Sequence, residues 1–151
     1  MAVSRFEEWL AGVDLDVSVR KFPEGTRTAT DAARAVGCEV GQIVKSLVFV
    51  AGGRPVVALV SGANRLDESR LGAVAGTPVT KADAAVAREA TGYAIGGVPP
   101  FAHATDVPVF MDRDLLAYTS VWAAAGRPDS VFEIQPERLR ELSKAAVVDL
   151  K

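Results

Sequence analysis

The chain has 151 residues, of which 49% are hydrophobic and 24% are charged, and its formal net charge is -2 at pH 7. This balance is typical of a soluble globular protein and excludes intrinsic disorder. Cys38 is the single cysteine, which excludes a disulfide scaffold. No apolar stretch approaches the roughly 20 residues that span a bilayer, and the first residues do not resemble a secretory signal. We therefore expect a cytoplasmic protein with no membrane partner, folded as one domain over residues 1–151.

Local patterns then predict short elements in chain order. Helices are expected at 4–11, 30–37, 66–75, 80–90 and 137–142. Ser4, Thr30 and Thr80 are expected caps, Gly37, Gly76 and Gly92 are expected stops, and Pro136 suits the first turn of the last helix. Strands are expected at 17–22, 43–50, 55–60, 78–79, 107–111, 120–125, 131–134 and 145–150. The clearest pair, 43–50 and 55–60, flanks a Gly-Gly centre and predicts a largely buried β-hairpin. Because hairpins and short helices are mixed irregularly, we expect a mixed α/β sheet or barrel with helices packed on it.

Lys45 lies inside the first strand of that hairpin. Side chains alternate along a strand, so Lys45 shares a face with Leu47 and Phe49. Removing its amine from water is costly unless another group compensates. Two interpretations stay open: an edge lysine whose amine reaches water, or a lysine directed into a pocket to meet an anion or a carbonyl oxygen.

The segment 93–103, Tyr-Ala-Ile-Gly-Gly-Val-Pro-Pro-Phe-Ala-His, fits neither a helix nor a strand. Glycines let the main chain approach a ligand, and prolines hold the shape of a loop. Converging N–H groups in such a loop can bind a phosphate or a developing oxyanion. The alternative is a tight connection that binds nothing. The spacing is that of neither a Walker loop nor a dinucleotide fingerprint.

The remaining chemistry-bearing residues are few. His103 is the only histidine, and it either orients a substrate and shuttles a proton or is structural. With one histidine and one cysteine we expect no transition-metal site and no cofactor. Cys38 is interpreted as a small buried filler and Trp122 as a core residue rather than a ligand platform. Asp112 and Asp114 are interpreted as caps of a helical turn.

Several of these segments, in this order, resemble the YbaK / prolyl-tRNA-synthetase-associated domain family over about residues 27–142. Residues 28–37 and 41–49 resemble its lysine-bearing strand and the segment before it. Residues 92–103 are similar to its Gly-x-x-x-Pro loop, here Gly96 to Pro100, and 121–126 with 131–132 also fit. Ala102 departs from the pattern, because the family commonly has glycine there, and this puts the size of the substrate in question.

The resemblance implies an α/β (α+β) fold with a mixed, largely antiparallel, β-barrel-like sheet and peripheral short helices. Members of this family hydrolyse the ester between a wrongly attached amino acid and tRNA. The implied function is that of a free-standing trans-editing deacylase for a small amino acid on tRNA, with proline tRNA as the expected carrier. The acceptor end of aminoacyl-tRNA is the implied partner, an aminoacyl-tRNA synthetase is a second candidate partner, and no DNA partner is expected.

The resemblance also implies the site residues. Lys45 and the main-chain N–H groups of Gly96, Gly97 and Val98 are the expected catalytic groups. The candidates for substrate binding are Thr28, Ser61, Gly62, Pro99, Pro100, Phe101 and His103. The alternative function is that of a module that binds the aminoacyl-tRNA 3′ end without cleaving it, or of a partner of a synthetase.

Overall fold

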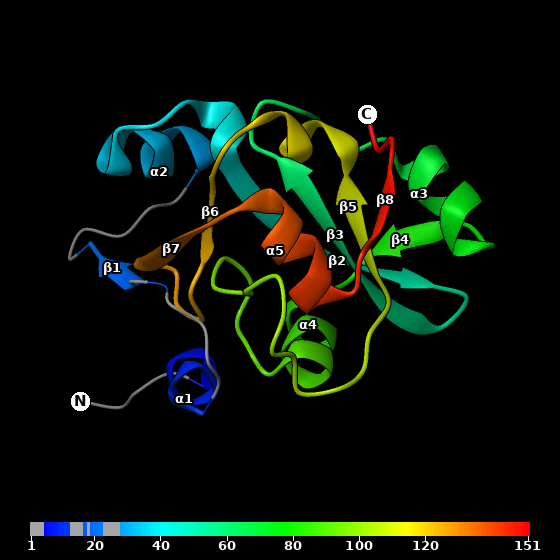
Figure 1. Ribbon diagram of the computed structural model, residues 1–151. Coiled ribbons are helices and arrows are strands. Elements are labelled where there is room, and N and C mark those ends of the chain that lie inside the picture. The colour runs from blue at the N-terminus through cyan, green and yellow to red at the C-terminus, as the bar shows by residue number, and fades with distance from the viewer. Residues whose placement is uncertain (1–4, 13–16, 18, 23–27) are drawn as a thin grey trace.

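The structure is a computed structural model that describes residues 5–12, 17, 19–22 and 28–151 (Figure 1). Its helices are α1 (Arg5–Ala11), α2 (Ala29–Val36), α3 (Glu68–Ala75), α4 (Ala84–Thr91) and α5 (Pro136–Ser143), with 3-10 turns η1 (Val40–Gln42) and η2 (Arg113–Ala117). Its strands are β1 (Val19–Lys21), β2 (Ile43–Ala51), β3 (Arg54–Ser61), β4 (Val79–Lys81), β5 (Val109–Asp112), β6 (Val121–Ala124), β7 (Ser130–Ile134) and β8 (Ala146–Val148). The predicted cap at Ser4 and the predicted turn at Pro23 lie outside the described residues.

The strands form one mixed sheet in the order β1-β7-β6-β2-β3-β5-β8, with β4 also paired to β2. The pairs β1–β7, β6–β7, β2–β3 and β2–β4 are antiparallel, and β2–β6, β3–β5 and β5–β8 are parallel. The expected mixed, mostly antiparallel sheet with peripheral short helices is therefore confirmed. The pairings follow an open path with β1 and β8 at its two ends.

The predicted hairpin is the centre of this sheet. Gly52 and Gly53 join β2 to β3 with φ angles of 56° and 83°, the left-handed conformation that a tight two-residue hairpin turn requires. The other edge of β2 is shared by two strands. Parallel β6 pairs with Ile43 and Val44, and antiparallel β4 pairs with 49–51, so the middle of β2 lies between two partners.

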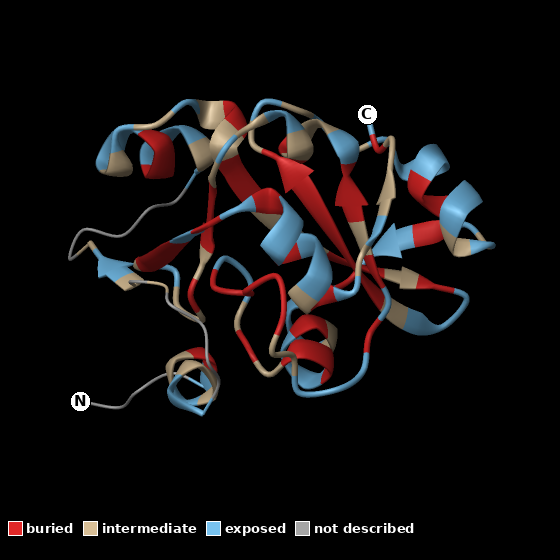
Figure 2. Cartoon of the chain, viewed as in Figure 1, coloured by how far each residue is buried: buried red, intermediate tan, exposed pale blue. Residues whose placement is uncertain are grey.

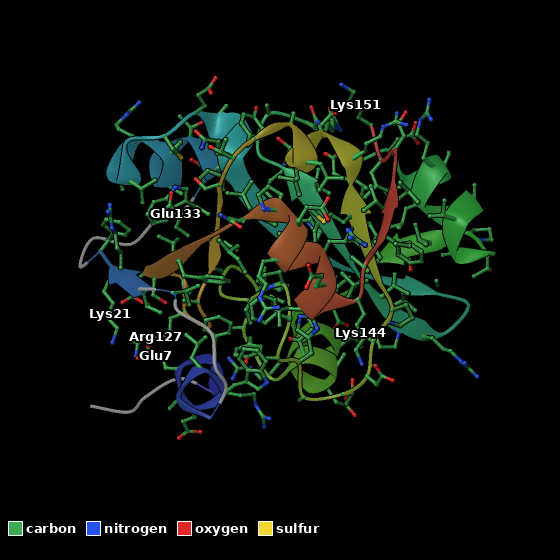
Figure 3. All side chains as sticks on the ribbon, in the orientation of Figure 1. Glu7, Lys21, Arg127, Glu133, Lys144 and Lys151 are labelled. Atoms are coloured by element: carbon green, nitrogen blue, oxygen red, sulfur yellow. The ribbon has the colours of Figure 1, made fainter. Side chains whose placement is uncertain are left out.

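The core is built on both faces of the sheet, and the exposed sides of the helices face outward (Figure 2). On one face, fully buried Phe6 of α1 stacks on Phe132 of β7 at a centroid distance of 4.8 Å, and Phe101 joins the same cluster. Lys21 of β1 and Glu7 of α1 add an ion pair of 3.5 Å beside this cluster (Figure 3). The loop after α4 is thus anchored in the core through Phe101.

Three local expectations were wrong. The cap of α2 is Thr28, whose Oγ1 accepts a hydrogen bond from Asp31, and not Thr30. The cap of α4 is Asp83 and not Thr80, because Thr80 pairs with β2 as part of β4. Cys38 is half-buried rather than a buried filler, since it follows the end of α2 near the surface.

Candidate functional site

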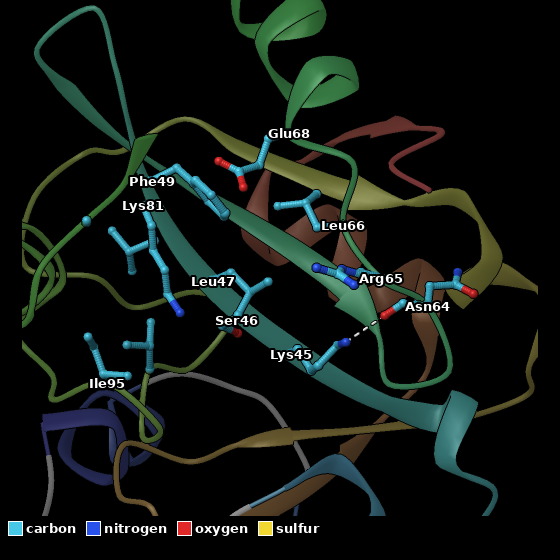
Figure 4. Close-up of a pocket in the computed structure, with 13 residues that line it drawn as sticks. Lys45, Ser46, Leu47, Phe49, Asn64, Arg65, Leu66, Glu68, Lys81 and Ile95 are labelled. Atoms are coloured by element: carbon cyan, nitrogen blue, oxygen red, sulfur yellow. Dashed lines mark hydrogen bonds between the residues drawn. The ribbon is translucent and has the colours of Figure 1, made fainter. Parts of the chain in front are cut away.

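Two adjoining cavities share the middle of β2 and the loop after α4. The first cavity has a volume of about 320 Å³ and the second of about 450 Å³. Both are lined by Lys45, Ser46, Leu47, Ile95 and Val98. The first extends toward Asn64, Arg65, Leu66, Glu68 and Lys81 (Figure 4). The second extends toward Thr28, Ala29, Ala32, Gly96, Trp122 and Ala123.

Lys45 lies on the wall that the cavities share. Its half-buried amine donates a hydrogen bond of 2.6 Å to the main-chain oxygen of Asn64 (Figure 4). Burial lowers the pKa of Lys45, and the negative charge of Asp112 acts in the opposite direction. Of the two interpretations of Lys45, the structure therefore favours an amine held at a cavity over one that is free in bulk water.

A polar network holds the acceptor of this hydrogen bond. The Nδ2 group of Asn64 donates to Oδ2 of Asp112 and to Oδ2 of Asp114, both at 2.8 Å. Asp112 is only 1% exposed, and it also accepts hydrogen bonds from the N–H groups of Ser61 and Asp114. Asp112 caps η2 as predicted, but its link to Lys45 was missed. The signal was available, because Ser61 and Asp112 end two neighbouring parallel strands and so meet at one edge.

Of the three loop residues whose N–H groups were predicted as donors, two line the cavities. Gly96, with a φ of 92°, lines the second cavity, and Val98 lines both cavities. Neither N–H group donates a hydrogen bond within the described residues. Gly97 differs from the prediction: its N–H donates to the oxygen of Ala94 at 3.0 Å, and an added Cβ would lie 2.9 Å from Cα of Arg127. Gly97 is therefore a packing residue of the loop.

The four predicted binding residues of this loop line neither of the two cavities. Pro99, Pro100 and Phe101 are buried, and Phe101 belongs to the aromatic core. Nε2 of His103 lies 2.7 Å from the oxygen of Pro99, and because a carbonyl only accepts, Nε2 carries the hydrogen. Burial lowers the pKa of His103, and the hydrogen bond to Pro99 acts in the opposite direction. The same hydrogen bond ties the ring to the main chain of the loop.

The candidates outside the loop are divided between the cavity and the core. Thr28 lines the second cavity and also caps α2. Ser61 is buried and donates from Oγ to the oxygen of Gly41 at 2.7 Å. Gly62 is so closely packed that an added Cβ would lie 2.3 Å from the oxygen of Val40. Thus the structure brings Thr28 to the cavities with Lys45, but not Ser61 or Gly62.

Ala102 adopts a left-handed conformation with a φ of 64° and lies outside both cavities. Its oxygen accepts a hydrogen bond of 2.8 Å from the Tyr93 hydroxyl, which holds this conformation. A left-handed backbone favours glycine, which accounts for glycine being common at this position in the family that the sequence resembles. The substitution thus acts on the backbone of the loop rather than on the width of a cavity.

Arg65, Lys81 and Ser46 are among the lining residues that were missed from the sequence. Arg65 and Lys81 direct their cationic groups toward the first cavity (Figure 4), and neither has an ion-pair partner among the described residues. Ser46 lies at the meeting point of the cavities. Its signal was visible, since with Lys45 it forms the polar pair of the otherwise apolar run 43–50.

Metal and membrane features were searched over the same described residues. That part of the chain contains no group of three or more His, Cys, Asp or Glu side chains placed to hold a metal ion. None of its helices has the length and apolar character needed to cross a membrane.

Solved structures resemble this fold closely. A candidate trans-editing enzyme for prolyl tRNA synthetase has a TM-score of 0.86 and 50% identity, with 89% of this chain and 86% of that chain covered. The hypothetical protein APE2540 has a TM-score of 0.88 and 33% identity, with 97% of this chain and 98% of that chain covered.

Relatives in sequence point the same way. The uncharacterized protein YwhH of Bacillus subtilis is 30% identical over 145 residues, which cover 95% of this chain and 90% of YwhH. The proline–tRNA ligase of Maridesulfovibrio salexigens is 31% identical over 107 residues, which cover 70% of this chain but only 18% of the ligase. The model of the aminoacyl-tRNA editing domain matches residues 23–142. Because this match spans most of the sequence, the chain belongs to the aminoacyl-tRNA editing domain family.

Proposed function

We propose that this protein is a free-standing deacylase that hydrolyses the ester of a small amino acid wrongly attached to tRNA, with proline tRNA as the carrier. The observation that carries the proposal is the meeting of Lys45 with Gly96 and Val98 around one cavity. A cation and main-chain donors in a partly desolvated site suit an ester whose carbonyl oxygen becomes negative. Similarity to proline–tRNA ligases and to the candidate trans-editing enzyme supports the choice of tRNA.

The mechanism requires placement more than a strong nucleophile, because an aminoacyl ester is already activated. Lys45, fixed by its hydrogen bond to Asn64, holds the ester region or the terminal phosphate by its charge. The N–H groups of Gly96 and Val98 stabilise the oxyanion while water or a hydroxyl group of the substrate attacks. His103 lines neither cavity, so we do not assign it as the base.

Charge at the first cavity fits the nucleotide part of this substrate. Arg65 and Lys81 bring two cations to that cavity, and Glu68 brings one carboxylate. Phosphates of the acceptor end are the complementary partner for such a rim. The second cavity has an apolar wall of Ala29, Ala32 and Ala123, which suits a small side chain.

The test is a deacylation panel on proline tRNA charged with alanine, serine, cysteine or threonine. The wild type should hydrolyse at least one of these above the uncatalysed rate. Lys45→Ala should lose at least about tenfold in kcat/KM, because one charge-assisted contact in the transition state is removed. Arg54→Ala is the matched control, since it removes an exposed cation at the hairpin turn, away from both cavities.

A binding module predicts a different result. It would bind mischarged tRNA without hydrolysing any member of the panel, and Lys45→Ala would weaken binding only. That outcome would overturn the deacylase proposal. A synthetase-associated partner predicts co-purification with the synthetase and no activity of either kind alone.

A further inference from the structure

β2 pairs with β3 along one edge and with β6 and β4 along the other. On this second edge, Ser46 lies in the opening between β6 and β4. The N–H group of Gly62 donates to the oxygen of Ile43 at 2.7 Å, which sets the alternation of the β2–β3 ladder. In an antiparallel ladder every second residue bonds to the partner strand. Lys45 and Leu47 therefore direct their main-chain groups to β3, and Ser46 directs its N–H and C=O groups to the opposite edge.

That edge is closed on both sides of Ser46. Val44 pairs with Ala123 of β6, and the oxygen of Val48 accepts a hydrogen bond of 3.1 Å from the N–H group of Ala82, just after β4. Between them, the N–H and C=O groups of Ser46 have no partner among the described residues. The opening thus offers the two main-chain groups of a single residue.

The opening coincides with the candidate site. Ser46 lines both cavities, and Ile95 and Val98 of the loop after α4 line them with it. The Oγ atom of Ser46 is also buried, and it has no hydrogen-bond partner among the described residues. Unsatisfied polar groups are rare in folded proteins and call for an explanation. Here they gather at one residue, on the wall where the cavities meet.

We infer that the α-aminoacyl group of the substrate fills this opening by pairing with the main chain of Ser46. Its α-amino group donates to the C=O of Ser46, and its ester carbonyl accepts from the N–H of Ser46. These are the two hydrogen bonds that one residue makes when a strand is added to a sheet edge. The inference rests on the proposed function. It adds that the α-amino group and the ester carbonyl, which all aminoacyl groups share, are recognised by the main chain of Ser46, separately from the amino-acid side chain.

The contact would also serve the reaction. The N–H group of Ser46 would remain bonded as the ester carbonyl becomes an oxyanion, and it would join Gly96 and Val98 as a donor. The main chain of β2 is fixed by its pairing with β3, so the donor needs no rearrangement. Side-chain selection would be left to the apolar wall of the second cavity.

The first test measures amide hydrogen exchange of the wild-type protein by NMR with 3′-deoxy-3′-(L-alanylamino)adenosine 5′-phosphate, a probe that cannot be hydrolysed as an ester. The exchange of the Ser46 amide should slow at least about tenfold when the probe is bound, because it gains an acceptor. The amides of Lys45 and Leu47, already bonded to β3, should change little and act as internal controls. Unchanged exchange at Ser46 with the probe bound would overturn the inference.

A matched probe isolates the α-amino group. The propionyl analogue keeps the carbonyl and the carbon skeleton but lacks the amine, so it should bind at least about tenfold more weakly. Equal affinity of the two probes would contradict the pairing. If the alanyl probe protects Ser46 but no mischarged tRNA is hydrolysed, the inference stands and the deacylase proposal fails.

A variant pair tests the reaction itself. Ser46→Pro removes the N–H group that β3 does not use, whereas Ser46→Ala removes only the hydroxyl group. Ser46→Pro should lose about 100-fold more in kcat than Ser46→Ala on alanyl-tRNA, which is the usual effect of one oxyanion donor. Equal rates for two folded variants would overturn the inference. The hydrogen-exchange experiment uses the wild-type protein, so it tests the inference even if Ser46→Pro does not fold.

Discussion

The amine of Lys45 and the main-chain oxygen of Asn64 are joined by a hydrogen bond of 2.6 Å that bridges β2 and the turn after β3. The side chain of the same asparagine donates to buried Asp112. The position of the lysine therefore depends in part on Asp112, which lines neither cavity. This relationship makes the site sensitive to changes in a second layer of polar groups.

Asp112→Ala should be strongly destabilising. The carboxylate accepts hydrogen bonds from Ser61, Asn64 and Asp114, and its removal leaves buried donors without acceptors. The free energy of unfolding should fall by about 3 kcal/mol, measured by urea denaturation. Asp114→Ala should have a much smaller effect, because that carboxylate lies near the surface. Equal losses for the two variants would contradict a central role for Asp112.

Two serine variants should shift stability in opposite directions. Ser46→Ala removes a buried hydroxyl without a partner among the described residues, so it should raise the free energy of unfolding by about 1 kcal/mol. Ser61→Ala removes a buried hydroxyl that donates to Gly41, so it should lower the same quantity by about 1 kcal/mol. Urea denaturation of both variants measures the difference, and a destabilising Ser46→Ala would show that the hydroxyl has a partner.

The pH dependence of probe binding should report on Lys45. Burial lowers its pKa, so its amine loses the proton at a lower pH than an exposed lysine does. Binding of the alanylamino probe should weaken in wild type relative to Lys45→Arg as the pH rises toward the ordinary lysine value, because arginine stays charged. The ratio of the two dissociation constants removes the titration of the probe's own amine. A ratio independent of pH would exclude a contribution from the lysine charge.

The lowered pKa of Lys45 also affects the free energy of unfolding, which should change with pH in the opposite direction to probe binding. A lysine whose pKa is lowered by folding binds its proton more weakly in the folded state. The free energy of unfolding should therefore rise as the pH increases from the lowered pKa of Lys45 toward its unfolded value. Comparison with Lys45→Met, which has no titrating group, isolates this contribution in alkaline urea titrations.

Ala102→Gly should stabilise the protein. The residue has a φ of 64°, and relief of left-handed strain outweighs the extra freedom that glycine has in the unfolded chain. We expect a gain of about 0.5–1 kcal/mol in the free energy of unfolding. Ala104→Gly is the control, because Ala104 has no positive φ and should lose stability. A loss in both variants would show that the Tyr93 contact compensates the strain fully.

Elements with strong local signals could be predicted from the sequence. The Gly-Gly centre and its apolar flanks specified the β2–β3 hairpin, and the resemblance added the mixed sheet and short helices. Caps were less certain, because neighbouring hydroxyl and carboxyl groups compete: Asp83 caps α4 where Thr80 was expected. The role of Thr80 was set by pairing with β2, which no local pattern around it indicates.

The candidate site was predicted only in outline. Lys45 and the loop after α4 were found because their composition is unusual within their segments. The opening at Ser46 depends on where β4 and β6 stop along one edge of β2, and these strands are distant in sequence. The N–H group of Gly97 was expected to be available, but the turn to Ala94 engages it. Such features follow from tertiary pairing rather than from residue type.

Trp122 gives the molecule an optical reporter. The guanidinium of Arg20 lies 4.9 Å from the centre of its ring, and the same tryptophan lines the second cavity. The other tryptophan, Trp9, is packed against Phe6 and Phe101, away from that cavity. Indole emission depends on local polarity, so occupancy of the second cavity will change the fluorescence of Trp122 and leave that of Trp9 constant. Filling of the cavity can thus be followed in real time without a label.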